Sequence, residues 1–233
     1  QMLGVLLNDD NLAGESIYEE LLPEVVKRLE SQDLIVESEG ALVVFPDGWY
    51  NRENEPLPLI IRKGDGGYNY ATTDLACIIN RVESIECNEM LYVVGAEQSQ
   101  HFSMVFQVAK DAKFIDEKTK AVHVSFGLVM GSDGKKLASR EGKAITLEEL
   151  LEESVNRAEK LILEKNSSMS DSDRKKVSKM IGIGAIKYAD LSIDRNKNYV
   201  FDWDKMLSFD GNTAPYLQYA HARICSIFRK SSI

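Results

Sequence analysis

Hydrophobic and polar positions follow helical and strand periods in turn along the first 145 residues. Apolar side chains recur at helical spacing within 15–30, which predicts an amphipathic helix. The runs LIVES and ALVVF, separated by Glu-Gly, predict a β-hairpin. PLIIRK at 58–63 is typical of a short buried strand, GDGGY ends it, and a helix is expected at about 73–82.

Two apolar runs that each stop at a glycine flank a helical pattern in the middle of the chain. The runs are LYVVGA (91–96) and AVHVSFG (121–127), and the helical pattern lies at 101–112. A strand, helix and strand joined by short connections predict a βαβ unit with parallel strands. Ligands of such sheets bind beyond the carboxyl ends of the strands, which directs attention to 95–101 and 127–143.

The second half of the chain is predicted to be mostly helical. Thr-Leu-Glu-Glu at 146–149 matches a capping box, so a helix should begin there and run to about Lys165. The Ser/Asp-rich stretch 166–173 is the best candidate for a linker, and a second long helix should follow it. A short strand at 199–203 and a helix at 212–228, with Pro215 in its first turn, complete the pattern.

Composition places the chain among ordinary soluble globular proteins. Hydrophobic residues make up 44% and charged residues 28% of its 233 positions, and no apolar run reaches the length of a membrane span. The start has no basic segment of a signal peptide, and the three cysteines form no C-x-x-C pair, which favours a reducing, cytoplasmic compartment. The three histidines have no partner at metal-ligand spacing, so no metal site is expected.

The stretch GSDGKKLASREGK (131–143) is the strongest candidate for phosphate binding. The net charge of −9 argues against a basic coat over the whole protein, yet this stretch carries four basic residues against two acidic ones. Its glycines permit close backbone approach, while Lys135, Lys136 and Arg140 offer charge to phosphate oxygens. The alternative is a flexible solvated turn. GIGAIK (182–187), by contrast, lies within a helical run and indicates close helix packing.

Two further stretches carry candidate binding groups. In YNYATTDLA, Tyr70 and Asp74 are four residues apart near a helix start, so both face one side, where a ring and a carboxylate can hold a cation. In VGAEQSQHF, Gly95 follows a strand, and Glu97 and Gln98 come directly after it, with Gln100 and His101 beyond. The alternatives are a core tyrosine with a helix-dipole aspartate, and a polar loop that caps the next helix.

Four stretches together resemble the bacterial arginyl-tRNA synthetases, which are class I aminoacyl-tRNA synthetases. They are GDGGYNYATTDLA, YVVGAEQSQHF, GSDGKKLASREG and FDWDKMLSFDGNTAPYLQYAHARI, in the order and spacing of that family. The resemblance covers nearly all of the chain. It implies ATP-dependent ligation of L-arginine to tRNA(Arg) through arginyl-adenylate, a step of protein biosynthesis in the cytoplasm. ATP with Mg²⁺ would be a substrate, no tightly bound cofactor is expected, and family members are usually monomeric.

The resemblance assigns roles to individual residues. Tyr70 and Asp74 match the Y-x-x-x-D pair that grips the arginine guanidinium, and Gln98 matches a glutamine with the same contact. The 131–143 stretch resembles the KMSKS loop, with Lys136 at its first lysine and Ser139 in place of its second. Lys135 and Arg140 are candidates for the missing charge. The resemblance places Val129 and Met130 beside adenine, and Gly95 and Glu97 near the ribose.

The chain departs from the family at a second signature, His-x-Gly-His. In the family this signature binds the ATP phosphates from the side opposite the KMSKS loop. None of the three histidines fits it. We therefore expect a fragment, inactive alone, that begins and ends inside a longer enzyme. The main alternative is a free-standing, non-catalytic module that binds tRNA or arginine. A third hypothesis is an unrelated Rossmann-type nucleotide-binding enzyme.

The predicted fold is α/β: the C-terminal part of a Rossmann-like parallel-sheet catalytic domain, followed by a mostly helical region. We expect residues 1–145 to form that partial catalytic domain, with an insertion at about 15–57. Residues 146–208 should be a helical stem-contact region. Residues 209–233 should begin the anticodon-binding helical bundle.

Overall fold

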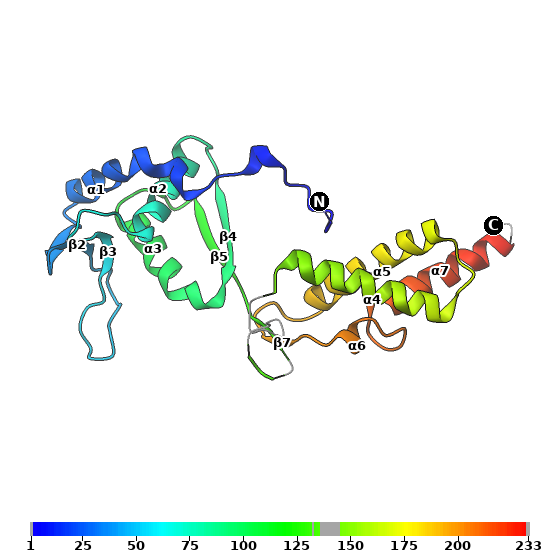
Figure 1. The fold of residues 1–233 in the computed structure, drawn as a ribbon. Coiled ribbons are helices and arrows are strands. Elements are labelled where there is room, and N and C mark those ends of the chain that lie inside the picture. The colour runs from blue at the N-terminus through cyan, green and yellow to red at the C-terminus, as the bar shows by residue number, and fades with distance from the viewer. Residues whose placement is uncertain (1, 132, 136–144, 232–233) are drawn as a thin grey trace. The chain divides into compact units, whose positions relative to one another are not determined.

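A computed structural model describes residues 2–131, 133–135 and 145–231 of the chain (Figure 1). The chain divides into two compact units. The α/β unit consists of Asn8–Phe126, and the helical unit consists of Gln1–Leu7 with Gly127–Ile233. Among the described residues, no helix is both long enough and apolar enough to cross a membrane.

The α/β unit contains two small sheets and three α-helices. Its elements in chain order are the 3₁₀ helices η1 (Asp9–Asn11) and η2 (Glu15–Leu21), α1 (Leu22–Ser31), β1 (Val36–Ser38), β2 (Ala41–Val44), β3 (Leu59–Arg62), α2 (Tyr70–Glu83), β4 (Glu89–Gly95), the 3₁₀ helix η3 (Ala96–Gln98), α3 (Ser99–Asp111) and β5 (Lys120–Phe126). Strands β1, β2 and β3 form an antiparallel sheet, which confirms the predicted hairpin.

The predicted βαβ unit is confirmed. Strands β4 and β5 pair in parallel from Glu89 opposite Lys120 to Gly95 opposite Phe126, with α3 between them in sequence. The carboxyl ends of both strands therefore meet at one edge, as the sequence pattern requires. This pair, together with the helical second half, confirms the predicted α/β class.

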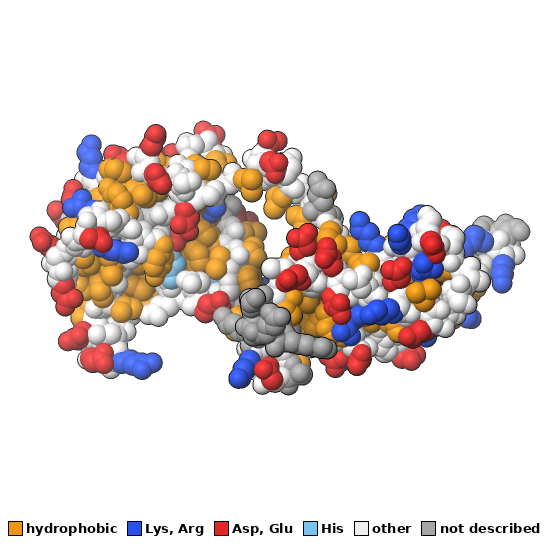
Figure 2. Space-filling model, viewed as in Figure 1, with side chains coloured by type: hydrophobic (Ala, Val, Ile, Leu, Met, Phe, Trp, Pro, Cys, Tyr) orange, Lys and Arg blue, Asp and Glu red, His pale blue; other side chains and the backbone are white. Residues whose placement is uncertain are grey.

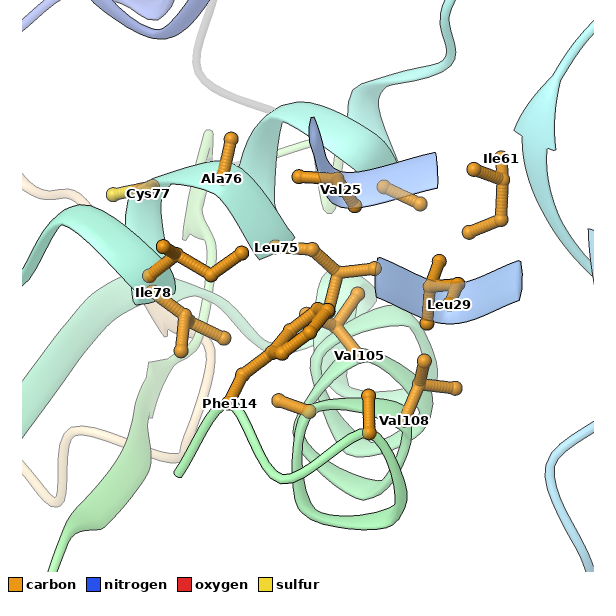
Figure 3. Close-up of a cluster of buried hydrophobic side chains, with 14 of the residues drawn as sticks. Val25, Leu29, Ile61, Leu75, Ala76, Cys77, Ile78, Val105, Val108 and Phe114 are labelled. Atoms are coloured by element: carbon orange, nitrogen blue, oxygen red, sulfur yellow. The ribbon is translucent and has the colours of Figure 1, made fainter. Parts of the chain in front are cut away.

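The core of the α/β unit lies between its helices and one face of the sheets. Figure 3 shows side chains from α1, α2, α3 and β3 converging on one another. Leu29, Ile61, Leu75 and Val105 are fully buried there. A buried hydrogen bond of 2.5 Å from the Thr72 hydroxyl to the Ile61 carbonyl ties the first turn of α2 to β3. This contact fixes the helix start that carries the predicted site.

Alternate residues of β4 face opposite ways. Met90 and Tyr92 are buried against the helices, whereas Leu91 and Val93 are 59% and 65% exposed. An apolar run of this kind is typical of a parallel strand buried on both faces. In the described chain, only one of those faces is covered.

Figure 2 shows apolar side chains among acidic and basic ones that are interspersed over both units.

The predicted helix at 15–30 is only partly correct. Residues 15–21 form the 3₁₀ helix η2, and the α-helix begins at Leu22. Pro23 has no N–H group to donate to the carbonyl of Glu19, so the α-helical ladder cannot extend back through it. The N–H of Leu22 reaches Glu19 instead, at 3₁₀ spacing. Ile17, one of the apolar residues at helical spacing within 15–30, is 57% exposed although that spacing predicts a buried face.

The helical unit is built around a pair of long helices. Its elements are β6 (Val129–Met130), α4 (Leu147–Lys165), α5 (Asp171–Leu191), β7 (Tyr199–Val200), α6 (Trp203–Met206) and α7 (Ala214–Ser231). The predicted capping box is present: Thr146 accepts from the N–H of Glu149, and Glu149 accepts from the N–H of Thr146. These hydrogen bonds hold the pKa of the Glu149 carboxyl below its usual range.

The linker predicted at 166–173 is wrong. Helix α5 already begins at Asp171, with Ser170 as its N-cap, and α4 and α5 pack along each other within one unit. Of the residues that suggested a linker, Ser170 is the N-cap of α5, and Asp171 and Asp173 lie in its first turn. The short stretch between the helices is a helix–helix connection.

The remaining elements of the helical unit largely follow the sequence pattern. Strand β7 covers the first part of the predicted 199–203 strand and pairs in parallel with β6. Helix α7 is capped by Thr213, whose hydroxyl accepts from the N–H of Tyr216 at 3.3 Å, with Pro215 in the first turn. The functional division at 145 and 208 stays a prediction.

Candidate functional site

The predicted guanidinium residues lie at the start of α2. The Asn69 side chain caps this helix by accepting a 2.9 Å hydrogen bond from the N–H of Tyr70. Tyr70 and Asp74 are therefore one turn apart on the same side of the helix. Tyr70 is 58% exposed, and the Asp74 side chain is 28% exposed. Both can be reached from solvent, as a binding site needs.

A third residue joins these two. The Nε2 atom of His101, in the first turn of α3, lies 2.6 Å from Oδ2 of Asp74. The centroid of the His101 ring lies 4.6 Å from that of Tyr70, with a 55° angle between the ring planes. The sequence indicated His101 only as a polar residue at the ligand edge. No spacing in the sequence indicates its contact with Asp74, which lies 27 residues away on another helix.

A cavity of about 380 Å³ opens beside this cluster. Its walls come from β3 and the two residues before it, the start of α2, η3 and the first half of α3: Leu57, Pro58, Leu59, Ile60, Asn69, Tyr70, Ala71, Glu97, Gln98, Gln100, His101 and Met104. Tyr70, Glu97 and Gln98 thus share one cavity. Asp74 is not part of its wall and contacts it through His101.

Gly95 is the last residue of β4 and comes two residues before Glu97, which lines the cavity. A Cβ atom at this position would overlap the carboxylate of Glu97, so the glycine leaves room for Glu97 to fold back over the strand end. Gln98 follows as the N-cap residue of α3. The structure therefore brings Gly95, Glu97 and Gln98 together at the carboxyl end of a parallel strand, where the sequence predicted a ligand.

The other predicted residues belong to the helical unit. The carbonyl of Met130 accepts a 2.8 Å hydrogen bond from Phe201, and that of Leu128 accepts one of 3.1 Å from Tyr199. Successive peptide groups of a strand point to opposite sides, so those of Val129 point away from β7. Of the two residues predicted beside adenine, Val129 thus has its main chain directed away from its neighbouring strand.

The described part of the predicted phosphate loop is a tight turn. The N–H of Gly131 donates to the carbonyl of Lys135 at 2.8 Å, and Gly134 adopts a φ of +72°, which favours glycine. The N–H of Lys135 donates to the Asp133 carboxylate at 3.0 Å. Lys136 and Arg140 lie outside the described residues.

Tyr18, Cys77 and Tyr92 form a buried group of ionisable side chains near Arg81, and burial raises the pKa of each of the three. The guanidinium of Arg81 lies 4.9 Å from the centre of the Tyr92 ring. Burial raises the pKa of both Tyr92 and the Cys77 thiol, and it raises that of Tyr18 to about 12. No group of three or more potential metal ligands occurs among the described residues.

Comparisons with known proteins place these features in context. The family model described as tRNA synthetases class I (R), catalytic domain, matches residues 2–203. An arginine–tRNA ligase of Klebsiella pneumoniae is 46% identical over 99% of this chain, and one of Shigella dysenteriae serotype 1 is also 46% identical. In both cases the match covers 40% of the relative, so the chain spans less than half of their length.

Solved structures agree with this comparison. Arginyl-tRNA synthetase from Plasmodium falciparum matches all of this chain over 38% of its own length, with a TM-score of 0.81 and 33% identity. The enzyme from Thermus thermophilus matches 93% of the chain over 41% of its own, with a TM-score of 0.74. Its 23% identity makes that second match a likeness of fold.

Proposed function

Because the chain belongs to the class I tRNA synthetases of the arginine type, through their catalytic domain, we propose that it serves in ATP-dependent ligation of L-arginine to tRNA(Arg). One observation carries this proposal. Tyr70 and Asp74 both contact His101 beside a cavity that Gln98 also lines. The three residues that resemblance assigns to the guanidinium thus lie in or next to one pocket.

The chemistry of this group suits arginine. A guanidinium presents five N–H donors in a flat fork, and a carboxylate, an amide oxygen and a phenol oxygen can accept from it. Asp74, Gln98 and Tyr70 supply these three groups. The ammonium group of lysine is a compact charge without the flat fork, so it cannot form the same paired bonds. A site built on such bonds rejects analogues that leave its polar groups unpaired.

The proposed reaction has two steps. A carboxylate oxygen of arginine attacks the α-phosphorus of ATP. The bond between the α-phosphorus and the oxygen that bridges to the β-phosphorus breaks, so pyrophosphate departs and arginyl-adenylate forms. A hydroxyl of the terminal tRNA ribose then attacks the arginyl carbonyl, and AMP leaves. Lys135, Lys136 and Arg140 would stabilise the charge that develops on the phosphates. ATP enters with Mg²⁺ as a substrate, and we propose no tightly bound cofactor.

The nucleotide would lie against the residues that follow the strands. The main chain of Val129, with Met130 next to it, is proposed to contact adenine, and Gly95 with Glu97 to face the ribose. We propose that the protein acts in the cytoplasm as a monomer. Without a His-x-Gly-His signature, these residues would form one side of the phosphate site, so the chain by itself should be inactive.

Pyrophosphate exchange tests the proposal. The assay compares the chain with a hybrid ligase, in which this chain replaces the matching segment of a full-length arginine–tRNA ligase. The hybrid ligase should exchange pyrophosphate into ATP when arginine is present, and not when lysine replaces it. The chain alone should show no exchange. A folded hybrid ligase without arginine-dependent exchange would contradict the ligase assignment. Exchange by the chain alone would contradict its inactivity.

A further inference from the structure

His101 stands between two residues that the proposed function assigns to arginine. Its Nε2 lies 2.6 Å from Oδ2 of Asp74, and its ring lies against that of Tyr70. A carboxylate oxygen can only accept, so Nε2 carries the proton of this hydrogen bond. One side chain therefore contacts both the anion and the aromatic ring that are proposed to hold the guanidinium.

The imidazole is itself held firmly. Its side chain is only 10% exposed, and its ring contacts Phe102 at 5.1 Å in an edge-on arrangement in addition to Tyr70. Phe102 and Val105 anchor α3 in the core of the α/β unit. His101 is thus a fixed donor on a packed helix, while Asp74 is the more exposed partner, at 28%.

When one oxygen of a carboxylate is held by a hydrogen bond, the position of its second oxygen is restricted as well. With Oδ2 of Asp74 bound to His101, Oδ1 remains to accept a second hydrogen bond. A guanidinium N–H that approaches Oδ1 meets an acceptor whose orientation is already set, which lowers the ordering cost of binding. His101 also belongs to the cavity wall, whereas Asp74 does not, so it connects the carboxylate to the cavity.

We infer that His101 is a positioning residue of the guanidinium site: it orients Asp74 through Nε2–H and supports the ring of Tyr70. This inference deepens the proposed function and rests on it. The hydrogen bond from His101 to Asp74 should stabilise bound arginine equally in the ground state and in the transition state. Its loss should therefore raise KM for arginine and leave kcat nearly unchanged.

His123 offers a matched control. Its Nε2 donates to the carbonyl of Val94 at 2.9 Å, and its ring also lies 5.1 Å from Phe102. It touches the same core as His101 without a contact to Asp74. His101→Phe and His123→Phe each keep a ring and remove one Nε2–H donor. His101→Gln keeps a donor at position 101 and tests for rescue.

The kinetic test uses the hybrid ligase in pyrophosphate exchange. His101→Phe should raise KM for arginine at least about tenfold with kcat within about threefold, which corresponds to loss of one charge-assisted hydrogen bond. His101→Gln should recover part of that loss, and His123→Phe should leave KM within about twofold of the unchanged enzyme. Equal KM values for His101→Phe and the unchanged hybrid would overturn the inference while leaving the proposed function intact.

A second measurement covers variants that fail to fold. Imidazole ¹⁵N–¹H spectra of the unchanged chain report the protonation of each of its three histidines. His101 should carry its proton at Nε2 in a hydrogen bond, and the signature of that hydrogen bond should be lost in Asp74→Leu, which offers no acceptor. A neutral imidazole protonated only at Nδ1 would overturn the inference. If the folded hybrid ligase shows no arginine-dependent exchange, the proposed function fails, and the inference fails with it.

Discussion

The hydroxyl of Ser154 donates a hydrogen bond of 2.8 Å to the carbonyl of Gly182, and this bond joins α4 to α5. Ser154 is fully buried, and Gly182 is buried beside it. A Cβ atom at position 182 would lie 2.7 Å from the backbone nitrogen of Val155. The glycine pattern GIGAIK therefore serves close helix packing, as the sequence predicted.

Gly182→Ala should destabilise the protein. Backbone atoms of α4 would have to move away from the new methyl group, at a cost of about 1–3 kcal/mol in the free energy of unfolding. Gly184→Ala is the control, since its Cβ would press on Nε2 of Gln218, the end of a side chain that can move, and not on backbone. Moving Gln218 weakens its 3.1 Å hydrogen bond to the Met180 carbonyl and offsets the gain in helix propensity, so this variant should stay within about 1 kcal/mol of the unchanged protein. Urea denaturation of both variants checks the prediction, which fails if Gly182→Ala is as stable as Gly184→Ala.

Asp74→Ala should remove most arginine recognition. It deletes the charge that is proposed to pair with the guanidinium and leaves the Nε2–H of His101 without its acceptor. Losing one partner of such a pair costs about 2–5 kcal/mol, or roughly 30-fold or more in KM for arginine. The measurement is pyrophosphate exchange by the hybrid ligase. Asp10→Asn, an exposed change in η1, should leave KM unchanged; an unchanged KM in Asp74→Ala would refute the specificity assignment.

The ion pair between Arg28 and Glu83 should stabilise the protein in a pH-dependent way. Nη2 of Arg28 lies 3.1 Å from Oε2 of Glu83, and this guanidinium holds the pKa of the Glu83 carboxyl below its usual value. A lowered folded-state pKa gives stability above the unfolded value of about 4.3, and that stability is lost as pH falls through the folded value.

Glu83→Gln should therefore lower the melting temperature at pH 7 and have a diminishing effect as pH falls below about 4. The Glu83 side chain is 50% exposed, so solvent screening limits the effect to under about 1 kcal/mol. Thermal melts across this pH range provide the measurement, with the exposed Glu30→Gln on α1 as control. A difference that grows at low pH would contradict the expected sign.

Cys77 should react more slowly with iodoacetamide than the other two cysteines. It is 7% exposed, and burial raises the pKa of its thiol, so little reactive thiolate forms at pH 8. Cys87 and Cys225 are less buried. Mass spectrometry of peptides after timed labelling should find Cys77 modified last, by a factor of about ten or more. Equal rates in the folded chain would disprove this, while equal rates in denaturant are expected.

The amino-acid sequence by itself determined the local elements and the family. The hairpin, the βαβ pair, the capping box at Thr146 and the packing glycines follow from periods and spacings of a few residues, so one stretch of sequence is enough to predict each. The resemblance also singled out Tyr70, Asp74 and Gln98, since motif residues keep their order along the chain. Sequence periodicity failed at Pro23, where one missing N–H group keeps the α-helix from extending back to residue 15, as the apolar spacing predicts.

Only the tertiary structure decided which side chains meet. His101 and Asp74 are 27 residues apart, on two helices whose packing is set by buried residues such as Leu75 and Val105. No spacing in the sequence measures the distance between those helices. The apolar spacing of α2 and α3 gives each helix its buried face, but the fit of those faces brings an imidazole within 2.6 Å of a carboxylate. The sequence thus supplied the groups for the proposed guanidinium site, and packing of the core determined which of them touch.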